Sequence, residues 1–416
     1  MPALDVWLYG RRAGRLERVK GELRFGYDHE YVRAGHPPLS HSLPLRAEPF
    51  DDASAHSFFA NLLPEGDVRR HLARRLGIST ENDFDLLTAI GGDCAGAVSL
   101  FEPGSAPGPT TEESVRWLDD PSLAQTIADL PRKPLFADPE DGIRLSLAGA
   151  QDKLPVIVRE NRIGLPQAST PSTHIVKAPI GRLDGSVANE AFCLALAREL
   201  SIDAPYAVPR RAGSQEFLLV ERYDRRFTGE RHERLHQEDF CQATGVPPEL
   251  KYEREGGPGL TACFDLVREA ASVPAGDLLA LLDAVTLNFL IGNHDAHGKN
   301  FSLLYDADGT RLAPLYDLVS TAVYPGLSRK MAMKLGGEYR PDYVMRRHVD
   351  RFAAAAGLGV AAVRRRMEVL AELTPRRARA LRKRTSPETE HPILDAIVEV
   401  VDDRARHLAR ELERTD

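Results

Sequence analysis

Apolar and polar positions alternate in short runs along the first hundred residues. LDVWLYG (4–10) and GELRFGY (21–27) have the pattern of short strands, and DVRRHLARRLG (67–77) has the apolar spacing of a helix. The region ends on GGDCAGAVSLF (91–101). These runs predict a small α/β domain of strands and helices, which we place at residues 1–103.

A break in the pattern follows this domain. EPGSAPGPTTEES (102–114) is rich in Pro, Gly, Ser and Thr, as surface linkers are. A short helix is expected at 114–129, and PRKPLFADPEDG (131–142) interrupts the pattern again. The domain boundary therefore lies between about 102 and 140, and residues 104–140 are predicted to be a linker with one short helix.

After the linker the pattern changes to strands. IRLSLAGAQDKLPVIV (143–158) predicts a strand, a turn of small residues and a second strand. STHIVKAP (172–179) predicts a short strand closed by proline, and EFLLVERYD (216–224) predicts a strand buried on both faces. One helix, SVANEAFCLALAREL (186–200), interrupts them, and Ser186 is its expected N-cap.

Beyond about residue 225 the chain is predicted to be mostly helical. The exception is NFSLLYDADGTRLAPLYDL (300–318), which predicts a strand, an Asp-Gly turn and a second strand. A β-rich lobe (141–224) followed by a helical lobe (225–416) is the layout of the protein-kinase-like fold. The sequence therefore predicts an α+β, two-lobed, protein-kinase-like fold with an added N-terminal domain.

Composition places the chain among ordinary soluble globular proteins, with 43% hydrophobic and 28% charged residues. No apolar run approaches the roughly 18 residues that a membrane helix requires, and the N-terminus lacks the basic-then-apolar order of a signal peptide. The four cysteines lie far apart and include no C-x-x-C pair, which favours free thiols in a reducing compartment. We expect a cytoplasmic protein that does not bind a membrane.

Positive charge is concentrated near the C-terminus. The formal net charge is −7, yet residues 361–384 contain nine Lys and Arg against two Glu, about +7, so the rest of the chain carries about −14. Such a stretch is either a contact for phosphate or nucleic acid or a solvated helix face. The sequence alone favours the solvated face.

The cluster HDAHGKN (294–300) is dense in polar groups and follows an apolar stretch. GNHD (292–295) resembles the metal-binding turn of calcineurin-like phosphoesterases. A two-metal site of that kind also needs D-x-H, G-D-x-x-D and G-H-x-H motifs, because two metal ions about 4 Å apart need more than two ligands. The C-terminal third contains no G-H-x-H, and no G-D-x-x-D precedes the cluster, which disfavours this alternative.

The same cluster fits phosphoryl transfer better. Asp295 and Asn300 have the D-x-x-x-x-N spacing of a kinase catalytic loop, in which the aspartate meets the acceptor hydroxyl and the asparagine holds magnesium. A second metal aspartate should follow across a hairpin, and Asp317 lies 22 residues after Asp295. Carboxylate, amide and phosphate oxygens are suitable ligands for Mg²⁺.

The upstream lobe contains the remaining kinase elements in the expected order. Lys177 follows two β-branched residues on a predicted strand, as the phosphate-binding lysine of kinases does, and Glu190 lies in the first turn of the next helix. The turn in SLAGAQDK (146–153) offers backbone N–H groups to phosphates, although it matches neither G-x-G-x-x-G nor the Walker pattern. VERYD (220–224) ends a strand where a kinase hinge would contact adenine.

Each of these residues also has a simpler explanation. The Asx residues of the loop are common turn formers, Lys177 alone would more often be a surface lysine, and Asp317 could cap a helix. His294 and His297 are expected to be structural donors to backbone carbonyls rather than bases. The order of all these elements along the chain nevertheless favours a kinase.

Residues 4 to about 335 resemble the HipA family of serine/threonine kinase toxins. The segments that carry the resemblance, in order, are SLAGAQDK, NEAFCLALARELSI, FLLVERYDR, LHQEDFCQATGV, KYEREGGPG and IGNHDAHGKNFSLL…LAPLYDLVS. HSLPL, FFANLLPEG and GGDCAGAV resemble the family's N-terminal domain. The chain departs from the family at Ala296, where glycine is frequent, and its N-terminal match is looser than its kinase match.

The resemblance implies ATP and Mg²⁺ as cofactors and assigns the site residues. Asp295 would be the catalytic aspartate, supported by Lys177 and Glu190, and Asn300 and Asp317 would hold magnesium. The implied nucleotide contacts are Leu147, Ala148, Gly149, Ala150, Gln151, Asp152, Lys153, Lys177, Glu221, Arg222, Tyr223, Asp295, His297, Lys299, Tyr316 and Asp317. Phosphorylation of Ser146 would eject the 147–153 loop and switch the enzyme off.

The resemblance also implies partners and a biological role. Such kinases phosphorylate a protein, with aminoacyl-tRNA synthetases as known targets, and thereby arrest growth and cause persistence. A HipB-like helix-turn-helix antitoxin would neutralise the toxin and bind operator DNA with it, and the basic stretch at 361–384 would then be a candidate DNA or partner contact.

Two other function classes stay open at this point. A small-molecule phosphotransferase of the aminoglycoside-kinase type also carries such a loop, but the GGPG segment and the N-terminal domain argue against it. A catalytically idle co-repressor would act only through an antitoxin and DNA. It would not need Asp295, Asn300, Asp317 and Lys177 together.

Overall fold

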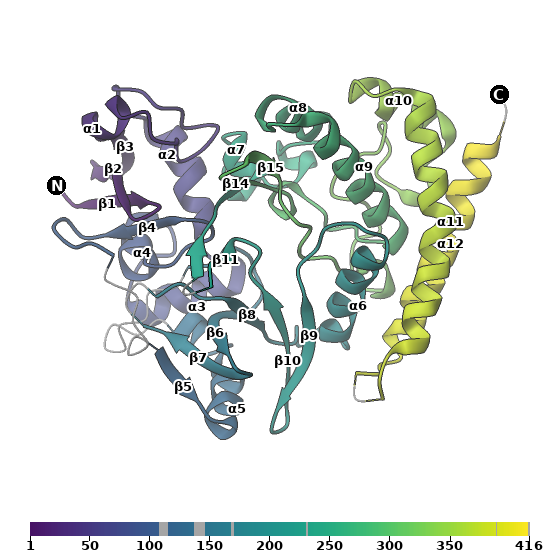
Figure 1. Cartoon of the computed structure of the whole chain (residues 1–416), viewed down its shortest axis with the longest axis horizontal. Coiled ribbons are helices and arrows are strands. Elements are labelled where there is room, and N and C mark those ends of the chain that lie inside the picture. The colour runs from purple at the N-terminus through teal and green to yellow at the C-terminus, as the bar shows by residue number, and fades with distance from the viewer. Residues whose placement is uncertain (108–114, 137–145, 168–169, 230–231, 388, 415–416) are drawn as a thin grey trace. The chain divides into compact units, whose positions relative to one another are not determined.

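The computed structural model describes residues 1–107, 115–136, 146–167, 170–229, 232–387 and 389–414 (Figure 1). Within it the chain divides into two compact units. Unit 1 contains Met1–Ala178, Arg210–Pro248 and Leu304–Ala307, and unit 2 contains Pro179–Pro209, Glu249–Leu303 and Asp308–Asp416. Each unit is described by itself.

Unit 1 begins with a four-stranded sheet in the order β3-β2-β1-β4. Its strands are β1 (Ala3–Leu8), β2 (Arg11–Val19), β3 (Glu22–Tyr27) and β4 (Val98–Phe101). The register pairs Val6 with Gly14 on one side and with Leu100 on the other, both antiparallel. The strand predicted at 4–10 thus pairs with β4, at the end of the GGDCAGAVSLF segment.

Helices bury the aromatic side chains of this region. They are α1 (His29–Arg33), α2 (Asp52–Phe59), α3 (Gly66–Leu76) and α4 (Asp83–Ile90), with a 3-10 turn at Ala60–Leu62. Phe25, Phe58 and Phe59 are fully buried in one hydrophobic cluster. The helix predicted at 67–77 is confirmed as α3, which ends at Gly77 in the left-handed conformation that favours glycine.

A second sheet of unit 1 has six strands in the order β5-β7-β6-β8-β10-β9. Helix α5 (Asp120–Asp129) packs on it and contributes Leu123 and Ile127 to a second hydrophobic cluster. The strands are β5 (Val115–Leu118), β6 (Lys153–Arg159), β7 (Arg162–Pro166), β8 (His174–Lys177), β9 (Ala207–Ala212) and β10 (Gln215–Glu221). The strands predicted around HIVK and EFLLVE are confirmed as β8 and β10.

Short elements complete unit 1. They are a 3-10 turn at Pro134–Phe136, β11 (Arg225–Phe227), β12 (His232–Arg234), β13 (His236–Asp239), α7 (Phe240–Ala243) and a 3-10 turn at Pro248–Leu250 that ends in unit 2. The sequence did not predict strands β11 to β13, because three or four residues are too few to show a period.

A buried charged cluster joins the two sheets of unit 1. Asp93, in the GGDCAG turn before β4, pairs with Arg225 at 2.9 Å, Arg234 at 3.0 Å and Arg222 at 3.5 Å. Asp224 accepts the Gly96 N–H at 2.7 Å and pairs with Arg222 at 2.7 Å. Burial alone would raise the pKa of Asp93, but the three guanidinium groups outweigh it and hold that pKa below its usual range.

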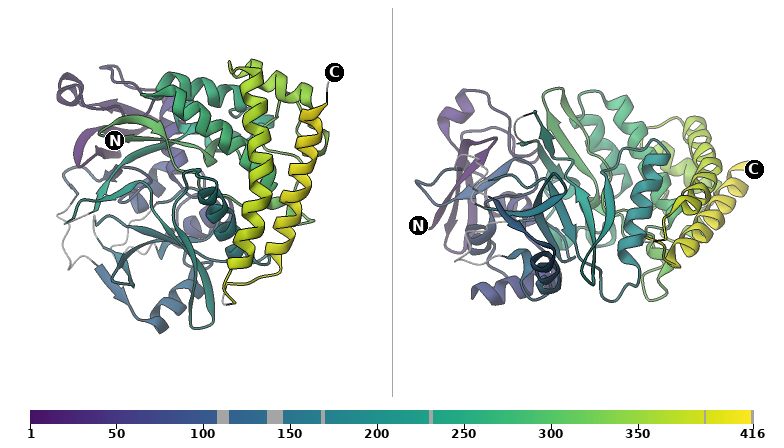
Figure 2. Two further views of the ribbon diagram at one scale, coloured as in Figure 1. Left: turned by 45° about the vertical axis from the view of Figure 1, so that its right-hand side comes forward. Right: turned by 60° about the horizontal axis from the view of Figure 1, so that its bottom comes forward.

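Unit 2 is mostly helical. Its helices are α6 (Ser186–Glu199), α8 (Leu260–Ala270), α9 (Pro274–Ile291), α10 (Arg346–Ala355), α11 (Val360–Arg384) and α12 (Ile393–Glu413). The long helices α11 and α12 run side by side, and both contact α9 and α6 (Figures 1 and 2). Its 3-10 turns are Glu253–Glu255, Gly298–Asn300, Thr321–Val323 and Pro341–Tyr343.

The hairpin predicted at 300–318 is confirmed, with β14 (Ser302–Asp306) and β15 (Gly309–Leu312) joined by a two-residue turn. The expected helix at 114–129 is partly wrong, because Val115–Leu118 form β5 and the helix begins only after its N-cap Asp119. The strand expected at residues 143–145 lies outside the described residues, and Ser146 and Leu147 are not in a strand.

The expected N-cap of α6 is also wrong. The N-cap is Gly185, whose φ of +67° favours glycine, and a Cβ there would lie 2.5 Å from the His391 ring. Ser186 is instead the first helical residue, and its hydroxyl accepts the Ile180 N–H at 2.9 Å. The cap depends on a residue more than 200 positions away in sequence, which local pattern cannot show.

Helix α9 corrects the expectation that no apolar run approaches the length of a membrane span. Its 18 residues have a mean hydropathy of 1.5, enough by length and composition alone. In the sequence, Asp277 and Asp283 divide the apolar positions into shorter runs. In the structure, these runs form one continuous helix. Residues 281–291 are buried and α9 packs against α8, α11 and α12, so it is the core helix of unit 2.

The basic stretch 361–384 forms most of α11, and six of its nine cations pair with carboxylates of unit 2. These pairs are Arg364–Asp350, Arg366–Asp283, Arg376–Glu372, Arg379–Asp402, Arg382–Asp395 and Arg384–Glu199. Arg365, Arg377 and Lys383 are exposed and have no ion pair within the described part of the chain. This neutralisation supports the solvated-face interpretation over a dedicated nucleic-acid contact.

All four cysteines are buried and free, as the spacing in the sequence predicted.

Candidate active site

Residues 146–152 of the predicted phosphate loop belong to no helix or strand. Hydrogen bonds within unit 1 hold them in place. Gly149 has a φ of +112°, and its carbonyl accepts the Glu65 N–H at 3.0 Å. The Asp152 carbonyl accepts the Ala178 N–H at 3.0 Å, and Gln151 donates to the Ala178 carbonyl at 2.8 Å. These bonds hold the loop against Ala178, the residue that directly follows Lys177 at the end of β8.

Two lysines face each other across neighbouring strands at this point. Lys153 on β6 is the antiparallel register partner of Lys177 on β8, so both side chains lie on one face of the sheet. Lys153 Nζ donates to the Ala148 carbonyl and lies close to Gly149, whose φ of +112° favours glycine. Opposed like charges are unfavourable, and a polyphosphate would neutralise both.

Ser146, the predicted phosphorylation site, is fully buried in this conformation. Its hydroxyl donates to the Leu62 carbonyl at 2.7 Å, and its N–H donates to the Asp93 carbonyl at 3.0 Å. Leu147 is buried beside it, whereas Ala150 is exposed. A phosphate on Ser146 would have no room here, so phosphorylation requires the loop to leave this position.

The predicted hinge lies at the end of β10. Glu221 is exposed and Tyr223 is half-buried, but Arg222 is only 1% exposed and pairs with Asp93 and Asp224. The Arg222 N–H donates to the Thr173 carbonyl at 2.9 Å, and its carbonyl accepts the Arg225 N–H at 3.2 Å. The geometry therefore supports Arg222 as a structural residue and leaves only a second lone pair on its carbonyl for a nucleotide.

The predicted catalytic loop lies in unit 2 and starts where α9 ends. Gly292 ends the helix with a φ of +68°, and a Cβ there would lie 2.6 Å from Ala322 Cβ, so only glycine fits. The Gly292 carbonyl accepts the Ala322 N–H at 3.0 Å and the Thr321 hydroxyl at 3.1 Å. The loop thereby leaves the helix in one fixed direction.

Asn293 connects the two predicted aspartates, and the sequence analysis did not identify it. Its side-chain oxygen accepts the Asp295 N–H at 3.1 Å, and its Nδ2 lies 3.5 Å from the Asp317 carbonyl. The same Nδ2 donates to Asn288 Oδ1 at 2.8 Å. One buried amide therefore holds the turn of Asp295 beside the turn of Asp317, although 22 residues separate them.

Asp295 itself is exposed, as an acceptor-binding carboxylate must be. Its Oδ1 accepts a hydrogen bond from the Tyr252 hydroxyl at 2.7 Å, and its carbonyl accepts the His297 N–H at 2.8 Å. Tyr252 lies in the KYEREGGPG segment and was not among the predicted site residues. The only sequence signal for it is its place in that segment.

The remaining loop residues are held by short local bonds. Asn300 Oδ1 accepts the His297 N–H at 3.3 Å, and the Lys299 carbonyl accepts the Tyr316 hydroxyl at 2.7 Å. The Tyr316 hydroxyl also lies 2.6 Å from the Ser302 hydroxyl. Tyr316 therefore ties the chain just before Asp317 to the chain that contains Asn300, which brings the two predicted metal ligands into one neighbourhood.

Asp317 has a left-handed backbone, with a φ of +51°. Positive φ is uncommon for a non-glycine residue and concentrates at functional sites. Asn300 and Asp317 offer hard amide and carboxylate oxygens, which suit Mg²⁺ completed by water and phosphate oxygens. Within the residues described here, no cluster of three or more His, Cys, Asp and Glu side chains forms a metal site of another kind.

The two histidines of the loop are buried. His294 Nδ1 lies 3.0 Å from the Ser328 carbonyl, and burial lowers the pKa of His294, so the neutral ring donates from Nδ1. This confirms the structural role expected for His294. The His297 ring packs edge-on against Tyr252, with ring centres 5.0 Å apart.

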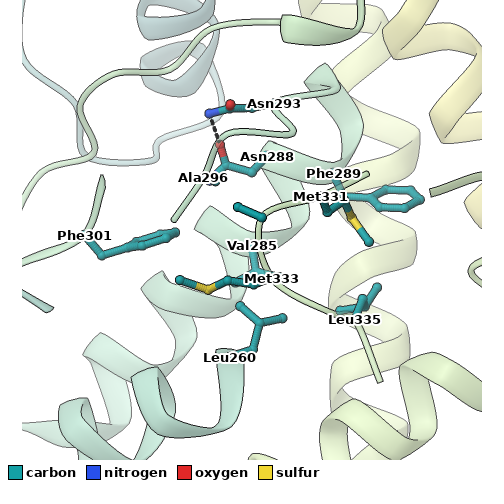
Figure 3. Close-up of a pocket in the computed structure, with 11 residues that line it drawn as sticks. Leu260, Val285, Asn288, Phe289, Asn293, Ala296, Phe301, Met331, Met333 and Leu335 are labelled. Carbon is teal, nitrogen blue, oxygen red and sulfur yellow. Dashed lines mark hydrogen bonds between the residues drawn. The ribbon is translucent and has the colours of Figure 1, made fainter. Parts of the chain in front are cut away.

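An apolar pocket lies beside the catalytic loop in unit 2 (Figure 3). It is partly open to solvent, and the space between its walls, open solvent included, is about 400 Å³. Its polar groups, the amides of Asn288 and Asn293, are bonded to each other (Figure 3). Its walls come from α8, α9, the catalytic loop and the 331–335 segment, and are formed by Leu260, Val285, Asn288, Phe289, Asn293, Ala296, Phe301, Met331, Ala332, Met333 and Leu335.

Each unit thus assembles half of a predicted kinase site. Unit 1 brings together the 146–153 loop and Lys177, and unit 2 brings together Asp295, Asn300 and Asp317. Glu190 is buried in the first turns of α6 in unit 2. Its predicted partnership with Lys177, which belongs to unit 1, stays a prediction.

Comparison with protein-family models gives two matches along the chain. Residues 4–101 match the HipA N-terminal domain, and residues 145–379 match the HipA-like C-terminal domain. The second match alone covers more than half of the chain.

Curated relatives agree with these matches. The chain is 45% identical over 377 residues to "Putative kinase Y4mE" of Sinorhizobium fredii, covering 89% of this chain and 90% of that protein. It is 32% identical over 346 residues to the "Serine/threonine-protein kinase toxin HipA" of Shewanella oneidensis, covering 80% of this chain and 78% of that protein.

A solved structure matches nearly the whole chain. It is a Shewanella oneidensis chain described as the toxin–antitoxin system HipA, HipB and its operator DNA complex. The TM-score is 0.83 at 28% identity, covering 99% of this chain and 97% of that one. The predicted α+β, kinase-like fold class is confirmed by this match.

Proposed function

Because the chain belongs to the HipA family and is a kinase of that family, we propose that it transfers a phosphoryl group from ATP to a serine or threonine of a protein. The observation that carries the proposal is the Asn293 side chain, which holds the turns of Asp295 and Asp317 together. Phosphoryl transfer depends on positioning and charge neutralisation rather than on covalent chemistry. A side chain that contacts the backbone of both turns keeps the two aspartates in one neighbourhood, which serves both.

Each predicted residue has a definite task in this reaction. Asp295 orients the acceptor hydroxyl and receives its proton, and its exposure makes it accessible to a protein substrate. Lys153 and Lys177, opposite each other on β6 and β8, bind the phosphates. Asn300 and Asp317 would hold Mg²⁺, which supplies charge neutralisation at the transferring group when bound.

Phosphorylation of Ser146 is proposed as the regulatory event. The buried hydroxyl is bonded to the Leu62 carbonyl, and the backbone of the same loop is bonded to Asp93, Glu65 and Ala178. A phosphate carries a charge of about −1.5 to −2 and three acceptor oxygens, which this buried place cannot accommodate. The modified loop would leave its position, and the nucleotide would lose the loop that covers it.

The biological role and partners are proposed from the family. The solved Shewanella oneidensis assembly contains HipA, HipB and operator DNA. By analogy, this chain is a growth-arresting toxin of the cytoplasm that a HipB-like helix-turn-helix antitoxin neutralises, with operator DNA bound through the antitoxin. The proposed substrate is a component of translation, with an aminoacyl-tRNA synthetase as the first candidate.

The test is incubation of the full chain with ATP and Mg²⁺, followed by intact-mass and peptide mass spectrometry beside Asp295→Ala. We expect one phosphate on Ser146 in wild type, at least a 100-fold slower gain in the variant, and unchanged ATP affinity in a binding titration. Lys177→Ala should weaken both transfer and ATP affinity, because a phosphate-binding cation acts in the ground state too.

Three outcomes separate the function classes. Phosphate gain that depends on Asp295 establishes the protein kinase. ATP binding without any phosphate on a protein would indicate a small-molecule phosphotransferase or a co-repressor. Equal turnover in wild type and Asp295→Ala would contradict the assignment of the catalytic aspartate.

A further inference from the structure

We propose that Tyr252 is a positioning residue for catalysis, which holds the Asp295 carboxylate by one oxygen and leaves the other oxygen for the acceptor hydroxyl. This inference rests on the proposed function and extends it to the KYEREGGPG segment, to which no role has been given so far. Every contact that carries it lies within unit 2.

Asp295 is fixed at two points. Tyr252 donates its hydroxyl to Oδ1 at 2.7 Å, and Asn293 accepts the Asp295 backbone N–H at 3.1 Å. No hydrogen-bond partner is found for Oδ2 in the part of the chain that the structure describes. The backbone bond sets the place of the residue, whereas the bond to Oδ1 sets the rotation of the carboxylate.

Tyr252 is itself held firmly against the catalytic loop. Its ring meets the His297 ring edge-on at 86°, and the neighbouring Lys251 carbonyl lies 3.4 Å from the Gly298 N. The Tyr252 carbonyl accepts the N–H groups of Glu255 and Gly257, both at 2.9 Å. The phenol is therefore not a mobile surface group, and it returns Asp295 to one orientation after each turnover.

The glycines of the segment make this arrangement sterically possible. A Cβ on Gly257 would lie 2.2 Å from the Leu250 carbonyl oxygen, and a Cβ on Gly259 would lie 2.8 Å from the Glu253 carboxylate. That carboxylate accepts the Lys334 N–H at 2.6 Å and pairs with its ammonium at 3.7 Å. The close approach of the Leu250 backbone explains glycine at 257, and the Glu253 side chain occupies the space that a Cβ at 259 would take.

Tyr252→Phe tests the inference, because it removes only the hydroxyl and keeps the ring against His297. We expect the rate of phosphate incorporation to fall about 10-fold, as for loss of one hydrogen bond to a charged group, with unchanged ATP affinity and unchanged Tm. Tyr339→Phe is the matched control, because Tyr339 is a half-buried tyrosine of the same unit, outside the catalytic loop. It should leave the rate within twofold.

A double-mutant cycle separates positioning from packing. In the Asp295→Ala background, Tyr252→Phe should cause no further loss of the residual rate, because the carboxylate it positions is gone. An equal loss in both backgrounds, or a wild-type rate for Tyr252→Phe alone, overturns the inference. Absence of Asp295-dependent transfer in the wild-type protein would instead contradict the proposed function, so the two failures are distinguishable.

A second inference comes from the apolar pocket in Figure 3. We infer that it receives an apolar side chain of the protein substrate, within about two residues of the phosphorylated position. Asn293 and Ala296, which flank Asp295 closely, belong to its wall. Consecutive Cα atoms are 3.8 Å apart, so a peptide whose hydroxyl meets Asp295 presents its neighbouring side chains to this pocket.

The chemistry of the wall selects an apolar occupant. Nine of the eleven wall residues are apolar, and one of the two amides uses its oxygen to accept a hydrogen bond from the other. Met331 and Met333 supply flexible, polarizable walls, which adapt to side chains of different shape. The pocket is therefore continuous with the proposed acceptor site and suited to Leu, Met or Phe rather than to a charged residue.

Phosphoproteomics of cells that express the wild type or Asp295→Ala tests this inference. Sites found only with wild type should carry an apolar residue within two positions. Met331→Trp, which fills the pocket, should reduce their phosphorylation at least 10-fold with ATP affinity retained, and Met331→Ala, which enlarges it, should widen the range of apolar residues found beside the phosphorylated position. Leu279→Trp, at an exposed position of α9, is the control.

Sites without an apolar neighbour, or wild-type phosphorylation by both Met331 variants, would overturn the pocket assignment. Neither result would affect the Tyr252 inference, because that depends on the hydrogen bond to Asp295 alone.

Discussion

The charged cluster around Asp93 allows a stability prediction with a magnitude. Asp93→Asn keeps the volume of the side chain and one acceptor oxygen but removes the negative charge. In the native protein that charge faces Arg225 at 2.9 Å, Arg234 at 3.0 Å and Arg222 at 3.5 Å, and Asp93, Arg222 and Arg225 are each 1% exposed. The substitution leaves three guanidinium groups with Asp224 as the remaining buried carboxylate.

Removing one partner of a buried ion pair costs about 3–5 kcal/mol, because the other charge stays buried without compensation. Asp224 still offsets part of the charge of Arg222 and Arg225, so we expect the lower end, about 3 kcal/mol. For a unit of roughly 200 residues each kcal/mol lowers Tm by about 2–4 °C, which gives a fall of about 6–12 °C.

The pKa of Asp93 gives the same prediction a pH dependence. Because that pKa is lowered in the folded protein, the stabilisation is fully present above the unfolded carboxyl pKa of about 3.9 and is lost as pH falls below it. The difference in stability between wild type and Asp93→Asn should therefore be constant above about pH 5 and shrink below about pH 4.

Calorimetry or urea unfolding of the full chain measures both effects. Asp28→Asn is the matched control, because Asp28 pairs with Arg12 at 2.7 Å but both side chains are substantially exposed, so the expected loss is about 0–1 kcal/mol. If Asp93→Asn were within about 0.5 kcal/mol of that control, or if its deficit did not change with pH, the argument from burial would be refuted.

Two further predictions concern single positions in the two units. Gly292→Ala should cost about 1–3 kcal/mol and slow phosphate transfer, because the residue has a positive φ and its Cβ would meet Ala322, whereas Gly276→Ala in the same helix has open space and should stabilise by about 0.5–1 kcal/mol. Burial raises the pKa of Glu238 to about 7, so the folded protein retains a proton there that the unfolded chain releases. Stability should therefore fall as pH rises from about 4.5 to 7, and Glu238→Gln, compared by calorimetry, should remove a decline on the order of 1–3 kcal/mol. Equal pH profiles for wild type and Glu238→Gln, or equal Tm values for the two glycine variants, would contradict these expectations.

The sequence by itself determined the elements whose signals are local. Short strand-like patterns marked β1 and β3, short apolar runs marked β8 and β10, and the Asp-Gly turn marked the β14–β15 hairpin, because these signals depend on neighbouring residues. The order of the loop, the strand lysine, Asp295, Asn300 and Asp317 likewise favoured a kinase, and the segments around these residues carried the resemblance to the family. These signals can be recognised in the sequence without knowing how the chain packs.

Only the tertiary structure showed which of these residues support one another. Asn293 joins the Asp295 and Asp317 turns, and Tyr252 reaches Asp295 from 43 positions upstream. Neither contact can be predicted from a periodic pattern in the sequence. A single hydrogen bond between two distant segments of the chain depends on where both segments lie in the folded protein.

The same reason explains the expected N-cap that failed and a side-chain role that the sequence did not show. Gly185 replaces Ser186 as the cap of α6 because His391 approaches it, and the Arg222 side chain pairs with Asp93, 129 positions away. Local pattern assigns a residue its most common role, whereas burial and close approach in the folded chain decide the role that it takes. The sequence thus determined the family and the order of the predicted site residues, and packing decided how Asp295 is held.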